Sequence, residues 1–151
     1  MLVEARYVHT NLIAHDWQKL SRFYQDVFGC VPVPPERHYK GADLDRGAGA
    51  RGAELHGEHL RLPGYGENGP TLEIYTYSLL EKGMPAAVNR PGFAHIAFSV
   101  TDVPGSRKAV LGAGGRAIGE VVILQVSTGR KVTWCYVTDL EGNIVELQSW
   151  S

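Results

Sequence analysis

Four residues with metal-binding side chains interrupt apolar segments of the sequence: His9, Glu73, His95 and Glu146. A histidine or glutamate inside an apolar strand costs free energy unless its side chain is paired or bound to a metal. Two neutral imidazoles and two carboxylates are a suitable ligand set for a divalent ion, and the carboxylates neutralise its charge. The alternative interpretation is that each residue is an ordinary strand residue with a hydrogen-bonded or solvated side chain.

The four residues belong to a weak internal repeat. In both halves a histidine, His9 or His95, is followed by an aspartate at +7 and a glycine at +20. Both halves close with an apolar strand centred on a glutamate, Glu73 or Glu146. The spacing from histidine to glutamate is 64 residues in the first half and 51 in the second, so the first half carries about 13 extra residues, for which the glycine-rich tract 40–52 is the obvious place. Such a duplication would bring all four side chains to one point.

The elements that must position these residues follow the same order in each half. In the first half we expect a strand over 7–13 and a helix over 17–28 with Asp16 as its N-cap and Gly29 at its C-terminus. In the second half we expect a strand over 93–100 and a helix from about 104 to 111. Further strands are expected at about 54–62, 71–77, 117–126, 132–138 and 144–150. The segment 78–91 is expected to be a linker, and 37–52 a glycine-rich, charged loop.

Composition excludes several classes of protein. The chain has 151 residues, 44% of them hydrophobic, which is enough for a folded interior. With 15 Lys and Arg against 16 Asp and Glu, it has no basic excess for nucleic acid or an anionic membrane. Cys30 and Cys135 form no CxxC pair and suggest free thiols, although one disulfide remains possible. We find no signal peptide or membrane span and expect a cytoplasmic protein.

Four segments together resemble a known superfamily over almost the whole chain. They are 9–29 (beginning HTNL and ending FYQDVFG), 70–75 (PTLEIY), 92–100 (GFAHIAFSV) and 139–147 (DLEGNIVEL). The pattern is similar to that of the vicinal oxygen chelate superfamily, which includes glyoxalase I, methylmalonyl-CoA epimerase, extradiol dioxygenases and the fosfomycin and bleomycin resistance proteins.

The resemblance implies a fold and a site. The fold would be α+β, with two tandem βαβββ modules that form a curved, cup-shaped mixed sheet with helices on its outer face. It would be a single domain over 1–151, with module 1 at about 5–77, the linker at about 78–91 and module 2 at about 92–151. The family's ligand positions fall on His9, Glu73, His95 and Glu146, for one divalent ion: Ni, Co, Zn, Mn or Fe.

The ligand set resembles that of glyoxalase I more than those of the other branches. Dioxygenases and fosfomycin enzymes typically use two histidines and one glutamate, and the epimerase has Gln at the position of Glu73. Bacterial glyoxalase I holds glutathione with an Arg four residues after the first ligand and an Asn four after the second. Those positions are Ile13 and Tyr77 here, so a glutathione-linked substrate is not expected.

Strand alternation predicts the wall around the ion. The predicted substrate-binding residues on it are Asn11, Ile13, Tyr75, Tyr77, Ser99 and Gln148, and Arg130 and Lys131 in a nearby loop are candidates for an anionic substrate tail. The wall suits a compact or aromatic, oxygen-bearing ligand. The alternatives are ordinary strand packing for the tyrosines and an exposed basic turn for the loop. His56 and His59, three apart in a strand, should face opposite sides and are expected to be surface or loop residues.

These observations favour a metal-dependent isomerase or lyase of the glyoxalase type, in which Glu73 or Glu146 moves a carbon-bound proton of a small substrate. One alternative is an extradiol-type dioxygenase, and another is a metal-free protein that binds or sequesters a drug. The family suggests a homodimer, with the site in one chain or across two. The 37–52 segment is hypothesised to cover the site as a lid.

Overall fold

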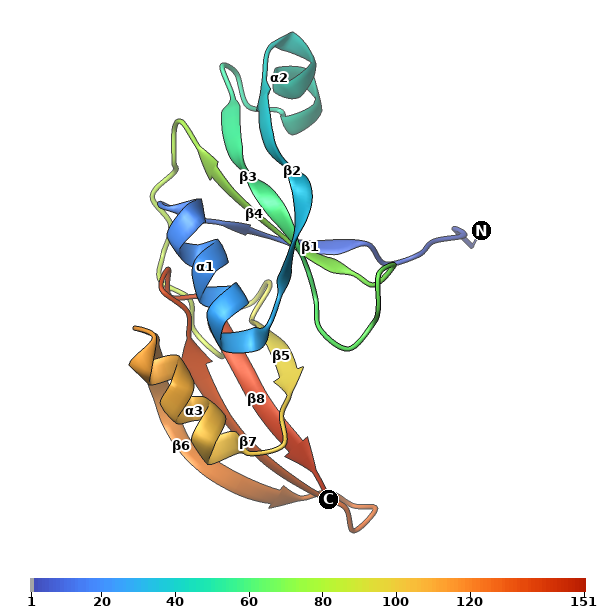
Figure 1. Ribbon diagram of the computed structural model, residues 1–151, viewed down its shortest axis with the longest axis vertical. Coiled ribbons are helices and arrows are strands. Elements are labelled where there is room, and N and C mark those ends of the chain that lie inside the picture. Colours follow the sequence, from blue (N-terminus) through green and yellow to red (C-terminus); the bar gives the residue numbers. More distant parts are fainter. Residues whose placement is uncertain (1) are drawn as a thin grey trace. The chain divides into compact units, whose positions relative to one another are not determined.

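The computed structural model describes residues 2–151, and in this part of the chain it contains eight strands and three helices (Figure 1). The first half comprises β1 (His9–Ile13), α1 (Trp17–Phe28), β2 (Val31–Lys40), α2 (Ala42–Ala48), β3 (Glu54–Arg61) and β4 (Thr71–Tyr77). The second comprises β5 (His95–Ser99), α3 (Val103–Gly112), β6 (Arg116–Gln125), β7 (Lys131–Thr138) and β8 (Ile144–Trp150). The chain divides into two compact units, Met1–Lys82 and Gly83–Ser151.

The first unit is a four-stranded mixed sheet with the strand order β1-β4-β3-β2. β1 and β4 are parallel, and the other neighbours are antiparallel. Helix α1 lies along one face of this sheet (Figure 1). The face against α1 carries Leu60, Leu72 and Ile74, all of them buried. Because successive side chains of a strand point to opposite faces, these apolar residues of β3 and β4 all pack on this side.

Helix α1 has the bounds that the sequence predicts. The side chain of Asp16 accepts a hydrogen bond from the Lys19 backbone N–H at 3.0 Å, and Gly29 ends the helix in the left-handed conformation with φ 68°. The backbone hydrogen bond of the N-cap lowers the pKa of Asp16. On the buried side of the helix, Leu20 and Tyr24 are fully enclosed, so one apolar stripe attaches α1 to the sheet.

The second unit repeats this arrangement with the strand order β5-β8-β7-β6, in which β5 and β8 are parallel. Helix α3 is capped by Asp102, whose side chain accepts a hydrogen bond from the Gly105 backbone N–H. Val103 and Val110 are its buried residues, and Leu147 of β8 is fully buried as well. Apart from shifts of one or two residues at their ends, the predicted elements of this half are confirmed.

The strand registers confirm the duplication. His59 of β3 lies opposite Glu73 in the first sheet, and Tyr136 of β7 lies opposite Glu146 in the second. The edge strands also have the same register irregularity. It begins directly after the residue that pairs with His59 or Tyr136, between Val33 and Arg37 in β2 and between Ile118 and Val122 in β6. The predicted α+β fold of two βαβββ modules is therefore confirmed.

The segment 37–52 differs from the prediction of a loop. Its first residues continue the edge strand β2, and Ala42–Ala48 form the additional helix α2 before β3 begins. The prolines at 32, 34 and 35 concealed this strand, because proline cannot donate to a ladder and is tolerated on an edge strand. Asp45 then closes the turn after α2, since its carboxylate accepts hydrogen bonds from the backbone N–H groups of Gly52 and Ala53.

Both cysteines are buried free thiols. Burial raises the pKa of Cys30 to about 11 and also raises the pKa of Cys135. Within the described residues, each of the three helices is too short or too polar to cross a lipid bilayer.

Candidate metal centres and substrate-binding faces

The side chain of Glu73 is at the centre of a polar cluster on the face of the first sheet opposite α1. Alternation along β4 puts Leu72 and Ile74 against the helix, so Glu73 projects from the other face. Nε2 of His9 lies 3.3 Å from one carboxylate oxygen, Oε2. The Asn11 amide donates to the same oxygen at 3.1 Å and to the Glu73 backbone carbonyl at 3.3 Å. The predicted pair of His9 and Glu73 is thus in contact.

His59 joins this cluster, and the sequence prediction for it was wrong. It lies in β3 directly opposite Glu73, with its Nε2 3.0 Å from the second carboxylate oxygen, Oε1. Its side chain is only 20% exposed, so it is neither a surface nor a loop residue. The Thr71 hydroxyl lies 3.1 Å from its Nδ1 and fixes the ring. The expectation that His56 and His59 face opposite sides was correct, and the antiparallel pairing of β3 with β4 was the signal that could have found His59.

The electrostatic surroundings keep His59 neutral. Burial lowers its pKa most strongly, against the opposing pull of the Glu73 carboxylate, and the positive charge of Arg37 lowers it further. A neutral imidazole has a nitrogen lone pair available for a metal ion. The Tyr75 hydroxyl lies 3.3 Å from His59 Nε2, and burial together with the charge of Glu73 raises the pKa of Tyr75 above its ordinary range.

The second sheet has a smaller cluster around Glu146. Nε2 of His95 lies 3.1 Å from its Oε2, and the carboxylate side chain is 17% exposed. Tyr136, directly opposite on β7, packs its ring 5.1 Å from that of His95 and 4.9 Å from that of Trp134. Burial and the charge of Glu146 raise the pKa of Tyr136. The predicted pair of His95 and Glu146 is therefore in contact, but Tyr136 and Trp134 were missed.

Trp134 carries an unsatisfied donor on this face. Its Nε1 is buried and has no hydrogen-bond partner among the described residues. Trp134 lies opposite Gln148, two residues from the pair of Tyr136 and Glu146, so it projects from the same side of the sheet. A buried N–H group without a partner costs free energy, and a bound oxygen would relieve that cost.

The other predicted wall residues fall into two groups. Asn11 and Tyr75 contact the Glu73 cluster, whereas Ile13 is 43% exposed on the same strand face as Asn11. Tyr77 lies at the end of β4, where it borders a cavity beside α1. Ser99 lies opposite Gln148, whose side chain accepts a hydrogen bond from the Trp150 indole.

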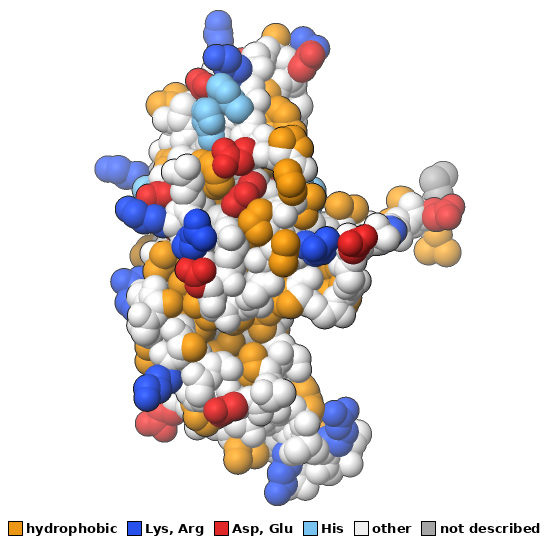
Figure 2. Space-filling view, in the orientation of Figure 1, with side chains coloured by type: hydrophobic (Ala, Val, Ile, Leu, Met, Phe, Trp, Pro, Cys, Tyr) orange, Lys and Arg blue, Asp and Glu red, His pale blue; other side chains and the backbone are white. Residues whose placement is uncertain are grey.

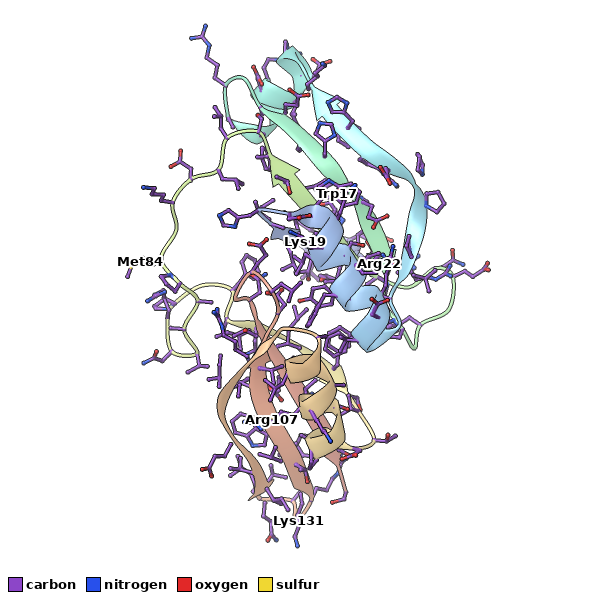
Figure 3. The ribbon with its side chains drawn as sticks, turned by 60° about the vertical axis from the view of Figure 1, so that its left-hand side comes forward. Trp17, Lys19, Arg22, Met84, Arg107 and Lys131 are labelled. Atoms are coloured by element: carbon purple, nitrogen blue, oxygen red, sulfur yellow. The ribbon has the colours of Figure 1, made fainter. Side chains whose placement is uncertain are left out.

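The two predicted basic residues lie at the hairpin between β6 and β7. The guanidinium of Arg130 stacks on the ring of Trp150 at 4.9 Å. Figure 3 shows Lys131 at the tip of this hairpin, pointing away from α3. Both are exposed. Neither is part of the ion pair of His95 and Glu146.

The donor set of the first sheet fits a divalent metal ion. His9, His59 and Glu73 each offer one ligand atom, and these atoms all lie within 4.8 Å of one another. Imidazole nitrogen and carboxylate oxygen suit Zn, Ni, Co, Mn or Fe. In the second sheet, His95 and Glu146 offer an imidazole nitrogen and a carboxylate of the same ligand types.

Solved structures of several bacterial proteins are similar to this chain. A glyoxalase family protein from Bacillus cereus has a TM-score of 0.74 at 18% identity, over 99% of this chain and 95% of that one. The genomically encoded fosfomycin resistance protein FosX from Listeria monocytogenes has a TM-score of 0.61 at 16% identity, over 100% and 96%. A glyoxylase/bleomycin resistance protein/dioxygenase domain from Frankia has a TM-score of 0.58 at 15% identity, over 100% and 94%. These likenesses concern the fold.

Among curated proteins, no sequence matches this chain. A family model does match, over residues 6–147, and it describes the glyoxalase/bleomycin resistance protein/dioxygenase superfamily. This match covers both polar clusters and most of both modules. The chain therefore belongs to the glyoxalase/bleomycin resistance protein/dioxygenase superfamily.

Proposed function

We propose that this protein is a metal-dependent enzyme of the glyoxalase type, which transfers a proton at a carbon next to an ion-chelated oxygen of a small substrate. The observation that supports this most is the environment of the two glutamates, each of which faces at least one imidazole within 3.3 Å on a half-buried sheet face. The proposed ligands are His9, Glu73, His95 and Glu146. We further propose that all four residues bind one ion, either within one chain or across a homodimer.

The contacts favour different roles for the two carboxylates. Glu73 is held on both oxygens, by His59 on Oε1 and by His9 and Asn11 on Oε2. A carboxylate held by three partners is a poor mobile base but a well-fixed ligand. We therefore assign Glu73 to ligand binding and to the orientation of both imidazoles.

Glu146 is better suited to proton transfer. Its contact to His95 involves Oε2. A carboxylate with one engaged oxygen can rotate toward a substrate carbon while the other elements of the site stay in place. The bound ion would act as a Lewis acid that stabilises the negative charge on the substrate oxygens, a contribution of several kcal/mol.

The remaining groups suit substrate binding. The Trp134 Nε1 and the Tyr136 hydroxyl are donors on the same sheet face as Glu146, and they can orient an oxygen-bearing substrate beside it. Ile13 and Tyr77 occupy the positions at which bacterial glyoxalase I has the Arg and Asn that hold glutathione, so the proposed substrate is a compact or aromatic compound with two neighbouring oxygens and no glutathione. Arg130 and Lys131 stay candidates for an anionic tail.

Solvent exchange tests this function without knowledge of the natural substrate. Protein loaded with Ni²⁺ or Zn²⁺ is incubated in D₂O with hydroxyacetone, and deuterium incorporation is followed by NMR. Hydroxyacetone has oxygens on two neighbouring carbons, and the carbon that carries the hydroxyl has an exchangeable C–H bond next to the carbonyl. We expect catalysed exchange that Glu146→Gln abolishes while the bound metal is retained. Equal exchange by wild-type protein and Glu146→Gln would remove the proposed proton transfer.

A second function has one specific observation in its favour. His9, His59 and Glu73 form a two-histidine, one-carboxylate group within a single sheet, the ligand type of non-haem Fe(II) oxygenases. Such a group leaves three positions open for a catechol and oxygen. Anaerobic loading with Fe²⁺, followed by measurement of oxygen uptake with catechol, distinguishes this extradiol reaction from proton transfer, which consumes no oxygen.

A further inference from the structure

A second group of metal-binding side chains lies on the opposite face of the first sheet. His38 of β2 pairs in register with His56 of β3, and Glu54 is two residues before His56 on the same strand face. Nε2 of His38 lies 2.6 Å from Glu54 Oε1, and Nε2 of His56 lies 3.6 Å from the same oxygen. Figure 2 shows pale-blue histidine atoms gathered on the surface of the first unit. The side chains of the three residues are 37–51% exposed.

The geometry of the three side chains favours an ion over a plain ion pair. The imidazoles of His38 and His56 are stacked with their centroids 3.8 Å apart and their planes 20° apart. Both rings face the same Glu54 carboxylate oxygen, so two imidazole nitrogens and one carboxylate lie close together. One ligand atom from each of the three residues lies within 4.8 Å of the other two. Ligands about 2 Å from a zinc ion are separated by about 3.3 Å, so small side-chain rotations close the site.

This group is separate from the Glu73 cluster. His56 and His59 are three residues apart in β3, so they project from opposite faces of the sheet. The duplicated module provides an internal comparison, because the register positions equivalent to His38, Glu54 and His56 are Ile123, Lys131 and Thr133. None of these three can form an imidazole–carboxylate site. The group is therefore particular to the first module and does not follow from the shared fold.

The site is accessible from outside the protein. His56 also borders a cavity of about 360 Å³, whose other lining residues include His15, Asp16 and Trp17 at the start of α1. Figure 3 places Trp17 at this end of the helix. An ion held by three protein ligands would keep at least one coordination position for water or an oxygen donor.

We propose that His38, Glu54 and His56 form a second binding site for a borderline divalent cation such as Zn²⁺, Ni²⁺ or Co²⁺. Two imidazoles and one carboxylate match these ions better than Mg²⁺ or Ca²⁺, which prefer oxygen ligands. The ion would link the edge strand β2 to β3. Because it would bind the folded state only, it would also stabilise the first unit in proportion to its saturation.

Equilibrium dialysis against Zn²⁺, with elemental analysis, tests the proposal. We expect the double variant His38→Ala/His56→Ala to bind about one equivalent per chain less than wild-type protein. His15→Ala, which removes a histidine from the neighbouring cavity but not from the site, should bind the wild-type amount. Circular dichroism in the absence of metal establishes that each variant is folded. Equal zinc content in wild-type protein and the double variant would overturn the proposal.

A further variant separates this site from the proposed catalytic centre. Glu73→Gln should weaken binding at the first cluster and leave the equivalent held by His38 and His56 in place. Conversely, the double variant should retain the hydroxyacetone exchange activity. If Glu73→Gln alone removes all bound zinc, the second site does not exist, whereas a zinc-free wild-type protein would contradict both proposals.

Discussion

The two modules present their central glutamates in different surroundings. Glu73 has His59 opposite it and Asn11 beside it, and these two side chains together with His9 hold its two oxygens. At the equivalent register positions Glu146 has Tyr136 and Ala97, of which Ala97 has no polar group. Duplication preserved the pair of histidine and glutamate in each sheet but not the residues around it.

Under the proposed function, this difference separates two tasks that a symmetric site would combine. A metal ligand has to be fixed, and the partners of Glu73 would fix it. A general base has to move toward its proton, and Glu146 would have fewer partners to lose when it moves. The bulky Trp134 on the second sheet corresponds to Gly57 on the first, so the space beside each glutamate differs as well.

The largest expected effect concerns the two carboxylates themselves. Glu146→Gln should lower deuterium exchange by about a thousandfold, because the general base is lost while an oxygen ligand remains. Glu73→Gln should instead lower the metal content, because it removes the negative charge of a proposed ligand and the carboxylate that the imidazoles of His9 and His59 contact. Exchange rates measured by NMR and metal content measured by elemental analysis, on the same samples, distinguish the two. If both variants lose metal equally, the division of roles is wrong.

A smaller effect is expected for the residues opposite the glutamates. His59→Ala should weaken Zn²⁺ affinity by about 10- to 100-fold, because the ligand Glu73 loses the partner that holds its Oε1. Tyr136→Phe is the matched change in the second sheet and should leave affinity within about twofold of wild type, because it removes only a hydroxyl. Competition with a chromophoric chelator measures both. A His59→Ala protein with wild-type affinity would contradict the role of His59.

The contrast between Gly57 and Trp134 can be tested by stability. A Cβ atom at Gly57 would lie 1.9 Å from the Ile74 carbonyl oxygen and 2.4 Å from the Tyr75 ring. Gly57→Ala should therefore lower the free energy of unfolding by about 3 kcal/mol through overpacking. The control is Gly47→Ala in α2, where a Cβ meets no atom within 4 Å. Urea denaturation measures both variants, and an unchanged midpoint for Gly57→Ala would show that β3 and β4 can separate without cost.

The buried thiols predict a dependence of stability on alkaline pH. Since burial raises the Cys30 pKa to about 11 from its usual 9.0, the folded state holds this proton more tightly than the unfolded chain. The resulting stabilisation is complete below pH 9.0 and is lost as the pH rises toward 11, by about 3 kcal/mol in total.

Variants of the two cysteines show which buried thiol causes this loss of stability at alkaline pH. Cys30→Ala should flatten the fall in unfolding free energy between these pH values. Cys135→Ala should flatten it less, because the positive charge of Arg107 partly offsets the effect of burial on the Cys135 pKa. Urea titrations at several pH values measure the slopes, and equal slopes for wild-type protein and Cys30→Ala would contradict the assignment.

The smallest effect compares the two helix caps, which the duplication kept alike. Asp16→Ala and Asp102→Ala should each lower the free energy of unfolding by about 1 kcal/mol, because each removes the acceptor for a backbone N–H in the first turn. Asp26→Ala, an exposed change near the other end of α1, is the control and should not destabilise. Losses that differ by more than about 1 kcal/mol between the two caps would show that the modules use them differently.

The sequence was sufficient for most of the fold because each module repeats short-range signals. The caps Asp16 and Asp102 and the alternation in β4 and β8 act locally, so they can be recognised without coordinates. The edge strand β2 was missed because its stability comes from pairing with β3, while its prolines locally disfavour a strand.

The candidate site shows the same limit. The pairs formed by a histidine and a glutamate were predictable, since duplication marks them in the sequence. The contributions of His59, Tyr136 and Trp134 depend on the register between antiparallel strands, which no local spacing encodes. His56 illustrates this as well, because only its pairing with His38 reveals a second cluster.

Anomalous diffraction from crystals of the Co²⁺-loaded protein tests the central claim most directly. The account predicts a strong peak within bonding distance of the carboxylates of both Glu73 and Glu146 and of the imidazoles of His9 and His95, in one chain or across two. A weaker peak between His38 and His56 would mark the second site. Cobalt bound to neither glutamate, or to each in a separate centre, would contradict the proposed catalytic site.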